Sequence, residues 1–155
     1  MPRATGPGAA APSACGYAAW RRRRCGRSAS GRSSPPAPRR RIVVAETDPD
    51  LRAILRALLE TSGHDVSAAT DGPEAFAAAL RVRPDVMLID VDLAGFDGYE
   101  LARRLRMTPE AKSTLLVALT GWGRADDVER ARAAGFDHHA TKPLDPDALA
   151  EILRR

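Results

Sequence analysis

The chain has 155 residues, the usual size of one domain, and its net charge of +4 is unevenly distributed. Residues 1–40 hold nine arginines and no acidic residue, whereas residues 41–155 hold 15 basic and 20 acidic residues. Both cysteines precede residue 41 and no apolar stretch approaches the roughly 20 residues that span a bilayer, which excludes a cysteine-stabilised domain and a transmembrane protein.

The N-terminal 40 residues differ in composition from the rest. They are rich in proline, glycine and serine, and only Tyr17 and Trp20 are large apolar side chains. Such a segment buries too little surface to offset its ordering entropy, so we expect residues 1–40 to be disordered and residues 41–155 to form one domain. Without the apolar core of a secretory signal, the protein is expected to be cytoplasmic. We expect the run Arg21–Arg24 to be solvated; contact with nucleic acid or anionic lipid, a transit peptide and a mis-chosen start codon are weaker alternatives.

The domain begins with a strand and a helix. The β-branched run RIVVAE, residues 41–46, is short and apolar, which predicts a buried strand. Residues 48–63 are predicted to form a helix, because Asp48 can cap its N-terminus and Gly63 can end it. Its inner face is predicted from apolar residues at helical spacing: Leu51, Ile54, Leu55 and Leu58.

In the next repeat, the sequence pattern of the strand is weak and that of the helix is clear. HDVSAAT, residues 64–70, predicts a short strand. Residues 71–82 are predicted to be helical, since Asp71 and Glu74 have the spacing of a capping box. The residues expected to face inward are Ala75, Phe76, Ala79 and Leu80.

The same alternation continues to the end of the sequence. Strands are predicted at 85–90, 114–120 and 137–142. Helices are predicted at 98–106, 125–135 and 145–155, the last with Leu149, Ile152 and Leu153 facing inward. Five β–α repeats imply an α/β fold in which helices cover both faces of a parallel sheet. In such sheets, ligand sites lie at the carboxyl ends of the strands.

Four polar residues stand at predicted strand C-termini: Glu46, Asp90, Thr120 and Lys142. Each alone has an ordinary explanation, such as a turn acid for Asp90 or a solvated surface lysine for Lys142. Together they suggest chemistry, because two carboxylates can share Mg²⁺ with a phosphate. A carboxylate flanked by a metal, a lysine and a hydroxyl is equipped to attack a phosphoryl group and to hold the product.

Four segments also carry a family resemblance: RIVVAETDPDLRAILRALLE, PDVMLIDVDLAGFDGYELARRLR, LLVALTGWG and AAGFDHHATKPLDPDALAEIL. In this order they resemble the successive blocks of the receiver domain of bacterial two-component response regulators, and AGFDHHATKP resembles receivers attached to hybrid histidine kinases. The resemblance covers residues 41–155. It implies a flavodoxin-like, doubly wound, five-stranded parallel sheet of strand order 2-1-3-4-5.

The resemblance implies a signalling role rather than an enzyme. The phosphoryl donor would be a phosphohistidine on a histidine kinase or a histidine phosphotransfer protein. No output domain follows the last predicted helix in this sequence. We therefore expect a stand-alone regulator or a phosphorelay member that acts through protein contacts.

The resemblance also assigns roles to individual residues. Asp90 corresponds to the phosphoacceptor, and Glu46 to the first of the family's paired metal-binding acids. Thr120 corresponds to the hydroxyl that contacts the phosphoryl group, and Lys142 to the lysine that pairs with it. Asp92 stands where the family offers a backbone carbonyl to Mg²⁺, so the implied metal ligands are Glu46, Asp90 and Asp92. The peptide bond between Lys142 and the proline after it is expected to be cis.

Two positions depart from the family pattern. Thr47 stands where the second metal-binding acid is expected, and a neutral hydroxyl is a poorer Mg²⁺ ligand than a carboxylate. Asp48 is one residue away and could compensate, although it also has the position of a helix cap. His139 occupies the place of the family's switch aromatic. Its neighbour His138 points to the opposite face of a strand, so the two histidines are not expected to form a metal pair.

Two other functions are weighed against the phosphoacceptor. Thr47 supports a pseudo-receiver, which binds partners without being phosphorylated. The run DVDLA at 90–94 partly matches haloacid-dehalogenase-like phosphatases, with Asp90 as nucleophile and Asp92 as acid. Against this enzyme, Ala94 replaces the required threonine or valine, and the length leaves no room for a cap domain.

Overall fold

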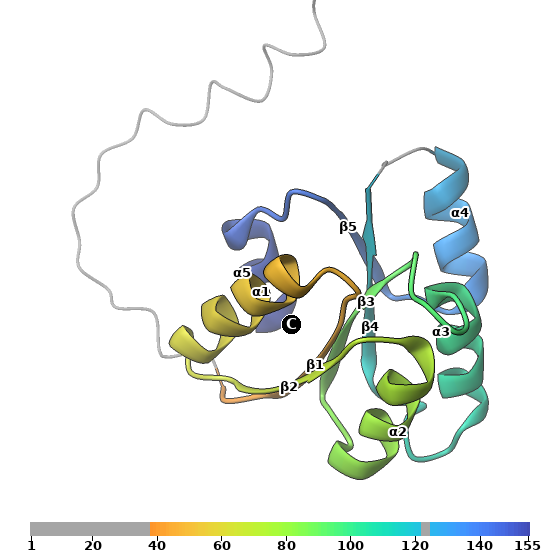
Figure 1. The fold of residues 1–155 in the computed structure, drawn as a ribbon, viewed down its shortest axis with the longest axis horizontal. Helices are drawn as coiled ribbons and strands as arrows, with labels where there is room; N and C mark the ends of the chain where they lie inside the picture. The colour runs from red at the N-terminus through yellow and green to blue at the C-terminus, as the bar shows by residue number, and fades with distance from the viewer. Residues whose placement is uncertain (1–37, 122–124) are drawn as a thin grey trace, which may run out of the picture. The chain divides into compact units, whose positions relative to one another are not determined.

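The computed structural model describes residues 38–121 and 125–155 (Figure 1). Its five strands are β1 (Arg41–Ala45), β2 (Asp65–Ala69), β3 (Val86–Asp90), β4 (Leu115–Thr120) and β5 (His138–Thr141). Its five helices are α1 (Pro49–Thr61), α2 (Gly72–Val82), α3 (Gly98–Met107), α4 (Ala125–Ala134) and α5 (Pro146–Arg154). Every predicted element is present, and no end differs from its prediction by more than two residues.

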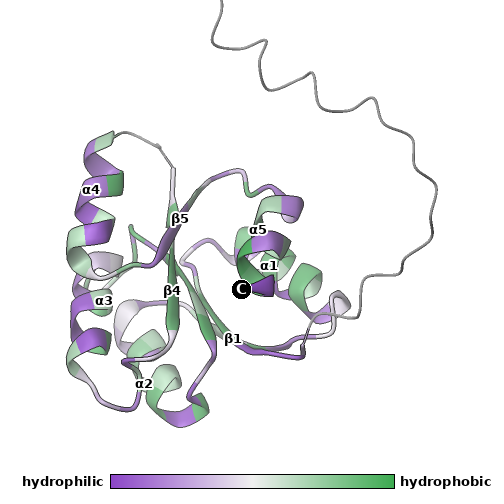
Figure 2. Cartoon of the chain, turned by 180° about the vertical axis from the view of Figure 1, so that it is seen from behind, coloured by the Kyte–Doolittle hydropathy of each residue, from purple (hydrophilic) through white to green (hydrophobic). Residues whose placement is uncertain are grey.

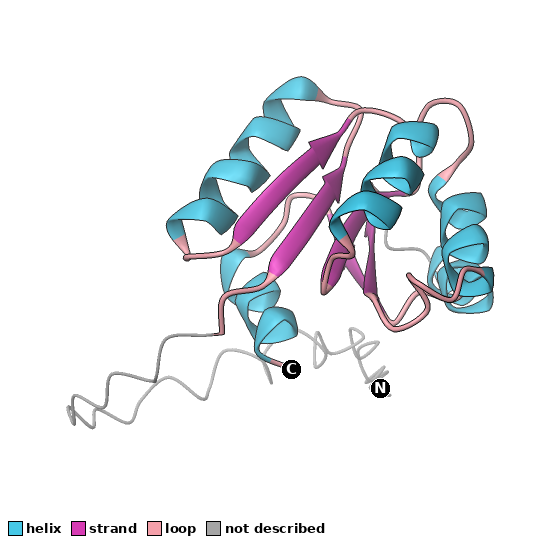
Figure 3. Cartoon of the chain, turned by 90° about the horizontal axis from the view of Figure 1, so that it is seen from below, coloured by secondary structure: helices cyan, strands magenta, loops and turns pink. Residues whose placement is uncertain are grey.

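The strands, magenta in Figure 3, form one parallel sheet. Their order is β2-β1-β3-β4-β5. This confirms the expected flavodoxin-like topology. β3 lies at the centre and pairs with β1 and β4, whereas β2 and β5 are the edge strands. All five residues of β3 are buried, as expected for a strand covered on both faces.

The helices cover the two faces of the sheet, with α1 and α5 on one side and α2, α3 and α4 on the other (Figure 1). Because side chains alternate along a strand, each strand contributes to two cores. On β3, Val86 and Leu88 pack towards α1 and α5, while Met87 and Ile89 pack towards α2 and α3. In Figure 2 the inner strand β4 is hydrophobic and the edge strand β5 is hydrophilic, while the helices alternate between hydrophobic and hydrophilic bands.

Aspartates begin four of the helices. Asp48 caps α1 by accepting hydrogen bonds from the backbone N–H groups of Asp50 and Leu51, at 2.8 and 3.2 Å. The remaining caps are Asp71 on α2, Asp97 on α3 and Asp145 on α5. Each carboxylate satisfies N–H groups that have no partner within the helix, and its charge is favourable at the positive end of the helix dipole. The predicted caps of the first two helices are confirmed.

Two residues predicted to face inward do not. Ile54 on α1 is 62% exposed and Leu80 on α2 is 39% exposed. Leu59 and Ala78 are buried instead. In α1, including Leu59 rotates the centre of the apolar face away from Ile54, because the ridge of residues four apart runs through Leu55 and Leu59. The prediction stopped one helical turn too early to detect this rotation.

Arg40, just before the predicted boundary at Arg41, is hydrogen-bonded to the residues at the start of β2. The carbonyl of Arg40 accepts a 2.9 Å hydrogen bond from the N–H of Asp65, and its own N–H donates to His64 Nδ1 at 3.3 Å. Residues 1–37 lie outside the described residues, so the disorder expected for the N-terminal segment stays a prediction. Within the described ranges, no helix is long and apolar enough to cross a membrane.

Candidate functional site

The four predicted site residues meet at the carboxyl edge of the sheet. Asp90 is the last residue of β3 and Thr120 the last of β4. Glu46 directly follows β1, and Lys142 directly follows β5. Parallel pairing of neighbouring strands brings their C-termini to one edge, so residues far apart in sequence become neighbours. The four positions therefore lie at one edge of the sheet, and their joint role as a site stays a prediction.

Lys142 connects the two carboxylates. Its Nζ lies 2.7 Å from Glu46 Oε2 and 3.0 Å from Asp90 Oδ2. Burial alone lowers the pKa of Lys142, but the contacts with Glu46 and Asp90 outweigh it, so the pKa is raised and the ammonium stays charged. The site therefore holds two carboxylates against one partly buried positive charge.

Glu46 is almost completely buried, at 1% exposure. Its Oε1 accepts a hydrogen bond from the N–H of Asp48 at 3.1 Å, and its Oε2 makes a close ion pair with Lys142 without the directionality of a hydrogen bond. Burial raises the pKa of Glu46 above its usual value, and this outweighs the lowering effect of Lys142. The nearby Asp90 carboxylate acts in the same direction as burial, so negative charge is in excess here.

Asp90 is fixed by its backbone surroundings and is 5% exposed. Its Oδ1 accepts a hydrogen bond from the N–H of Asp92 at 3.2 Å, while the side chain of Asp92 is exposed. Gly98 opens α3 directly against the carbonyl of Asp90, where any β-carbon would collide with the backbone. Only glycine lets the helix start so close to the acid.

Thr120 supplies a hydroxyl without a partner. The residue is 2% exposed, and its Oγ1 makes no hydrogen bond in the part of the chain that the structure describes. It also lines a cleft of roughly 640 Å³ between the β3–α3 loop, the start of α3, the end of β4 and α4. A buried hydroxyl without a partner is unfavourable in the absence of a ligand or water, so it is suited to contact a bound group.

Thr47 and Asp48 do not complete a three-acid site. Thr47 is exposed and its hydroxyl makes one long contact of 3.5 Å to the carbonyl of Thr70. The Asp48 carboxylate caps α1 by accepting from backbone N–H groups, and its role in place of the missing acid stays a prediction. Across residues 38–121 and 125–155, no group of three acidic, histidine or cysteine side chains is arranged to hold a metal ion.

Three further predictions concern the peptide bond after Lys142, the two adjacent histidines and Trp122. The Lys142–Pro143 peptide bond is cis, as expected. His139 is exposed and its neighbour His138 is half-buried, in agreement with opposite sides of an edge strand. Trp122, which follows Thr120 by two residues, lies outside the described residues.

Sequence reasoning missed three side chains around the site. Arg52 donates from Nη1 to the carbonyls of Glu46 at 2.8 Å and Thr47 at 3.2 Å, which fixes the backbone that carries the acid. Tyr99 and Arg130 line the cleft beside Thr120. The sequence could have indicated Arg52, because it lies one turn after the cap of α1. It could not have indicated Arg130, because the neighbours of Arg130 depend on tertiary packing.

A family comparison decides how this geometry is interpreted. The response regulator receiver domain model matches residues 42–154. The chain belongs to the response regulator receiver domain family. It is thus a receiver of two-component signalling, a non-enzymatic module, and the phosphatase interpretation of DVDLA is set aside.

Relatives include both free-standing and multidomain proteins. An uncharacterised 14.6 kDa protein of Leptolyngbya boryana is 35% identical over 114 residues, covering 74% of this chain and 87% of that protein. The virulence sensor protein BvgS of Bordetella pertussis is 36% identical over 126 residues, but the match covers 78% of this chain and only 10% of the sensor. The receiver spans about half or less of several other relatives.

Solved structures agree with the fold. The receiver domain of the sensor histidine kinase PA1611 from Pseudomonas aeruginosa, which has magnesium coordinated in its active-site cleft, is 30% identical, with a TM-score of 0.71 and coverage of 76% of this chain and 96% of that one. A response regulator from Chloroflexus aurantiacus is 29% identical, again with a TM-score of 0.71, and covers 76% and 99%. Hybrid-kinase receivers and ordinary response regulators are thus both among the relatives.

Proposed function

We propose that this receiver accepts a phosphoryl group on Asp90 from a phosphohistidine of a histidine kinase or histidine phosphotransfer protein. The observation that carries the proposal is the position of Lys142, within 3.0 Å of both Asp90 and Glu46, beside the unpartnered hydroxyl of Thr120. The phosphorylated form would signal through contacts with a downstream protein.

The proposed step is an in-line displacement at phosphorus. A carboxylate oxygen of Asp90 forms the new P–O bond while the bond from phosphorus to the donor nitrogen breaks, and the imidazole leaves with that electron pair. Lys142 balances the charge on the phosphoryl oxygens, and the Thr120 hydroxyl donates a hydrogen bond to one of them. Positioning and charge balance are the main requirements of phosphoryl transfer.

The residues present fit a divalent cation. Two buried carboxylates against one ammonium leave an excess negative charge. Burial raises the pKa of Glu46, and Asp90 makes a smaller contribution in the same direction. Glu46, Asp90 and the backbone carbonyl of Asp92 would hold Mg²⁺. When bound, Mg²⁺ would neutralise charge on the transferred group. Thr47 in place of a second acid makes this a poorer ligand set than a three-carboxylate site.

Acetyl phosphate tests the proposal directly. The full chain is incubated with it, with and without Mg²⁺, and intact mass counts the incorporated groups. We expect one Mg²⁺-dependent, hydroxylamine-labile group per chain, absent in Asp90→Asn. Asp126→Asn is the matched control, because it removes an equal charge from an exposed position on α4 and should retain the label. Equal labelling of Asp90→Asn would contradict the assignment.

A pseudo-receiver is the second candidate, and Thr47 favours it. With Thr47 exposed and Asp48 used as a cap, the site has fewer metal ligands than the family pattern supplies. The two candidates differ in the same experiment. A folded native chain that takes no phosphoryl group from acetyl phosphate, even at high Mg²⁺, would favour the pseudo-receiver.

A further inference from the structure

Arg130 of α4 is placed at the cleft beside Thr120 but has no partner of opposite charge. Its guanidinium lies over the ring of Tyr99, 4.7 Å from the ring centroid. The described residues contain no ion pair that involves Arg130. A cation above an aromatic ring at an exposed site is held weakly, so the guanidinium is free to exchange partners.

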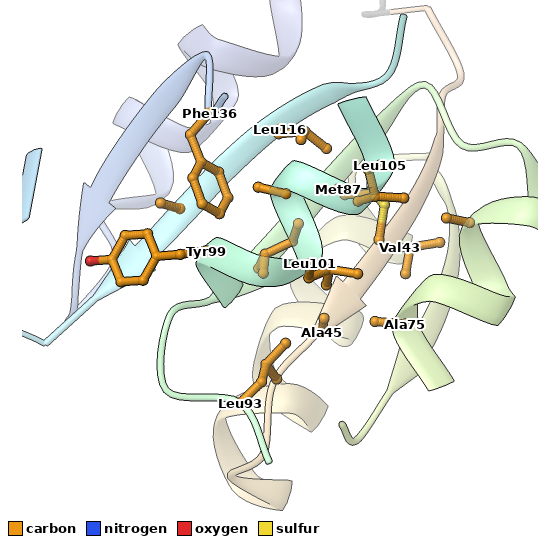
Figure 4. Packing of buried hydrophobic residues seen from close by; sticks show 14 of the residues in the cluster. Val43, Ala45, Ala75, Met87, Leu93, Tyr99, Leu101, Leu105, Leu116 and Phe136 are labelled. Carbon is orange, nitrogen blue, oxygen red and sulfur yellow. The ribbon is translucent and has the colours of Figure 1, made fainter. Parts of the chain in front are cut away.

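The ring under Arg130 is rigid. Tyr99 is only 6% exposed, and it packs edge-to-face on Phe136 with the ring centroids 6.3 Å apart. Figure 4 shows the two rings side by side, with the Tyr99 hydroxyl directed away from the core. Tyr99 is therefore a fixed platform, and any movement in this pair belongs to the arginine.

The cleft places Arg130 near the proposed phosphorylation site, because Thr120 and Val91, the residue after Asp90, line it together with Arg130. Arg130, Tyr99 and Thr120 all line the same space of roughly 640 Å³. The other charged residues that line it are Asp92, Asp97 and Asp127. Among the described residues that line the cleft, Arg130 is the one cation.

We propose that Arg130 is a positioning residue of the phosphorylated state: its guanidinium leaves the Tyr99 ring and binds the phosphoryl group on Asp90 across this cleft. The inference rests on the proposed phosphorylation of Asp90. A phosphoryl group brings more negative charge than the carboxylate it modifies, and it offers oxygens that a guanidinium binds through two parallel hydrogen bonds. The three aspartates already make the cleft negative. The added phosphoryl group would make the position near Thr120 the most favourable one for the Arg130 guanidinium.

The movement would carry the signal to α4. Arg130 is an exposed residue on this helix, so its change of partner alters the surface that α4 presents. His139, at the position of the family's switch aromatic, is also exposed and lies in β5, a separate element. Arg130 thus offers a connection between the phosphoryl group and the helix surface that does not pass through His139.

The ring signal of Tyr99 reports the movement. The chain has two tyrosines, so Tyr17→Phe leaves Tyr99 as the single tyrosine for ¹³C-labelled NMR of the full chain. We expect the Tyr99 ring signal to shift when acetyl phosphate and Mg²⁺ have phosphorylated the protein. In Arg130→Gln the resting signal should already be displaced, and most of the shift on phosphorylation should be lost. Arg130→Lys keeps the charge and should restore part of it.

Arg132→Gln is the matched control. Arg132 is an exposed arginine of the same helix that lines a different pocket, so its loss should leave the Tyr99 shift unchanged. Intact mass measures phosphorylation separately in every variant. Full incorporation with a stationary Tyr99 signal, or with the same shift in Arg130→Gln, would overturn this inference alone. Absence of incorporation in the folded native chain would overturn the proposed function and this inference together.

Discussion

Lys142 shares one positive charge between Glu46 and Asp90, so the resting site keeps an excess of one negative charge. Burial raises the pKa of Glu46, and the neighbouring Asp90 carboxylate adds a smaller contribution in the same direction, so the ionised acid is unfavourable here. The neighbouring Thr47 adds a hydroxyl and no charge. The residue at position 47 thus affects both the repulsion between the carboxylates of the site and the affinity of the site for a cation.

Thr47→Asp should separate these two effects. Without metal, a third carboxylate beside Glu46 and Asp90 should lower the free energy of unfolding by on the order of 1 kcal/mol. With Mg²⁺ the loss should be recovered, because a charged oxygen binds a hard cation better than a hydroxyl does. Thermal unfolding across a Mg²⁺ series measures both effects, with Thr47→Asn as the neutral control. Equal Mg²⁺ stabilisation of the native protein and Thr47→Asp would mean that water or Asp48 already completes the site.

His64 gives the domain a pH dependence near its N-terminal boundary. Burial, followed by the charge of Arg40, lowers the pKa of His64 below its ordinary value of 6.5. Above that pH the imidazole is neutral in both the folded and the unfolded chain. As the pH falls below 6.5 the unfolded chain takes up the proton first, so stability declines towards the folded pKa.

His64→Gln should remove this component. Glutamine keeps an oxygen that can accept the Arg40 N–H and does not titrate. Denaturant unfolding at pH 7.5, 6.5 and 5.5 should show the native protein losing up to about 1 kcal/mol relative to the variant at the lowest pH. Comparing the two proteins at each pH cancels the titration of Glu46 and the other acids. Parallel stability curves would show that His64 is protonated equally in both states.

At the scale of elements, α1 shows what sequence periodicity resolves. The helix, its cap at Asp48 and three of four inward leucines or isoleucines were predicted, because these depend on local spacing. The prediction that Ile54 faces inward was wrong, because the orientation of a helix on a sheet is set by packing against other elements. The same limit applies at the site: strand ends revealed Glu46, Asp90, Thr120 and Lys142, whereas Arg130 and Tyr99 meet only through the packing of α3 on α4.

A pair of alanine substitutions tests the corrected face of α1. Leu59→Ala removes a side chain that is 1% exposed and should cost about 2–5 kcal/mol of stability. Ile54→Ala acts on a side chain that is 62% exposed and should change stability by no more than about 0.5 kcal/mol. Chemical denaturation of both variants gives the comparison. Similar losses for the two would restore the face predicted from sequence.

At the scale of the whole molecule, Asp90 and Lys142, which form an ion pair, lie at the ends of strands that differ in burial and in pairing. Asp90 ends β3, the central strand, which is buried along its full length. Lys142 follows β5, a four-residue edge strand that pairs with β4 alone and is exposed at every second residue. Local opening is easiest where few buried contacts hold an element, so β5 should open more readily than β3.

Amide hydrogen exchange should make this difference visible. The amides of Met87 to Ile89 should exchange only when the whole domain unfolds, with protection equal to the global stability. The amides of β5 should exchange faster, through openings that leave the rest of the sheet intact. Comparable protection of β3 and β5 would contradict the expectation. The acid that would receive the phosphoryl group thus ends the strand expected to exchange most slowly. The lysine that pairs with it follows a strand expected to open and exchange faster.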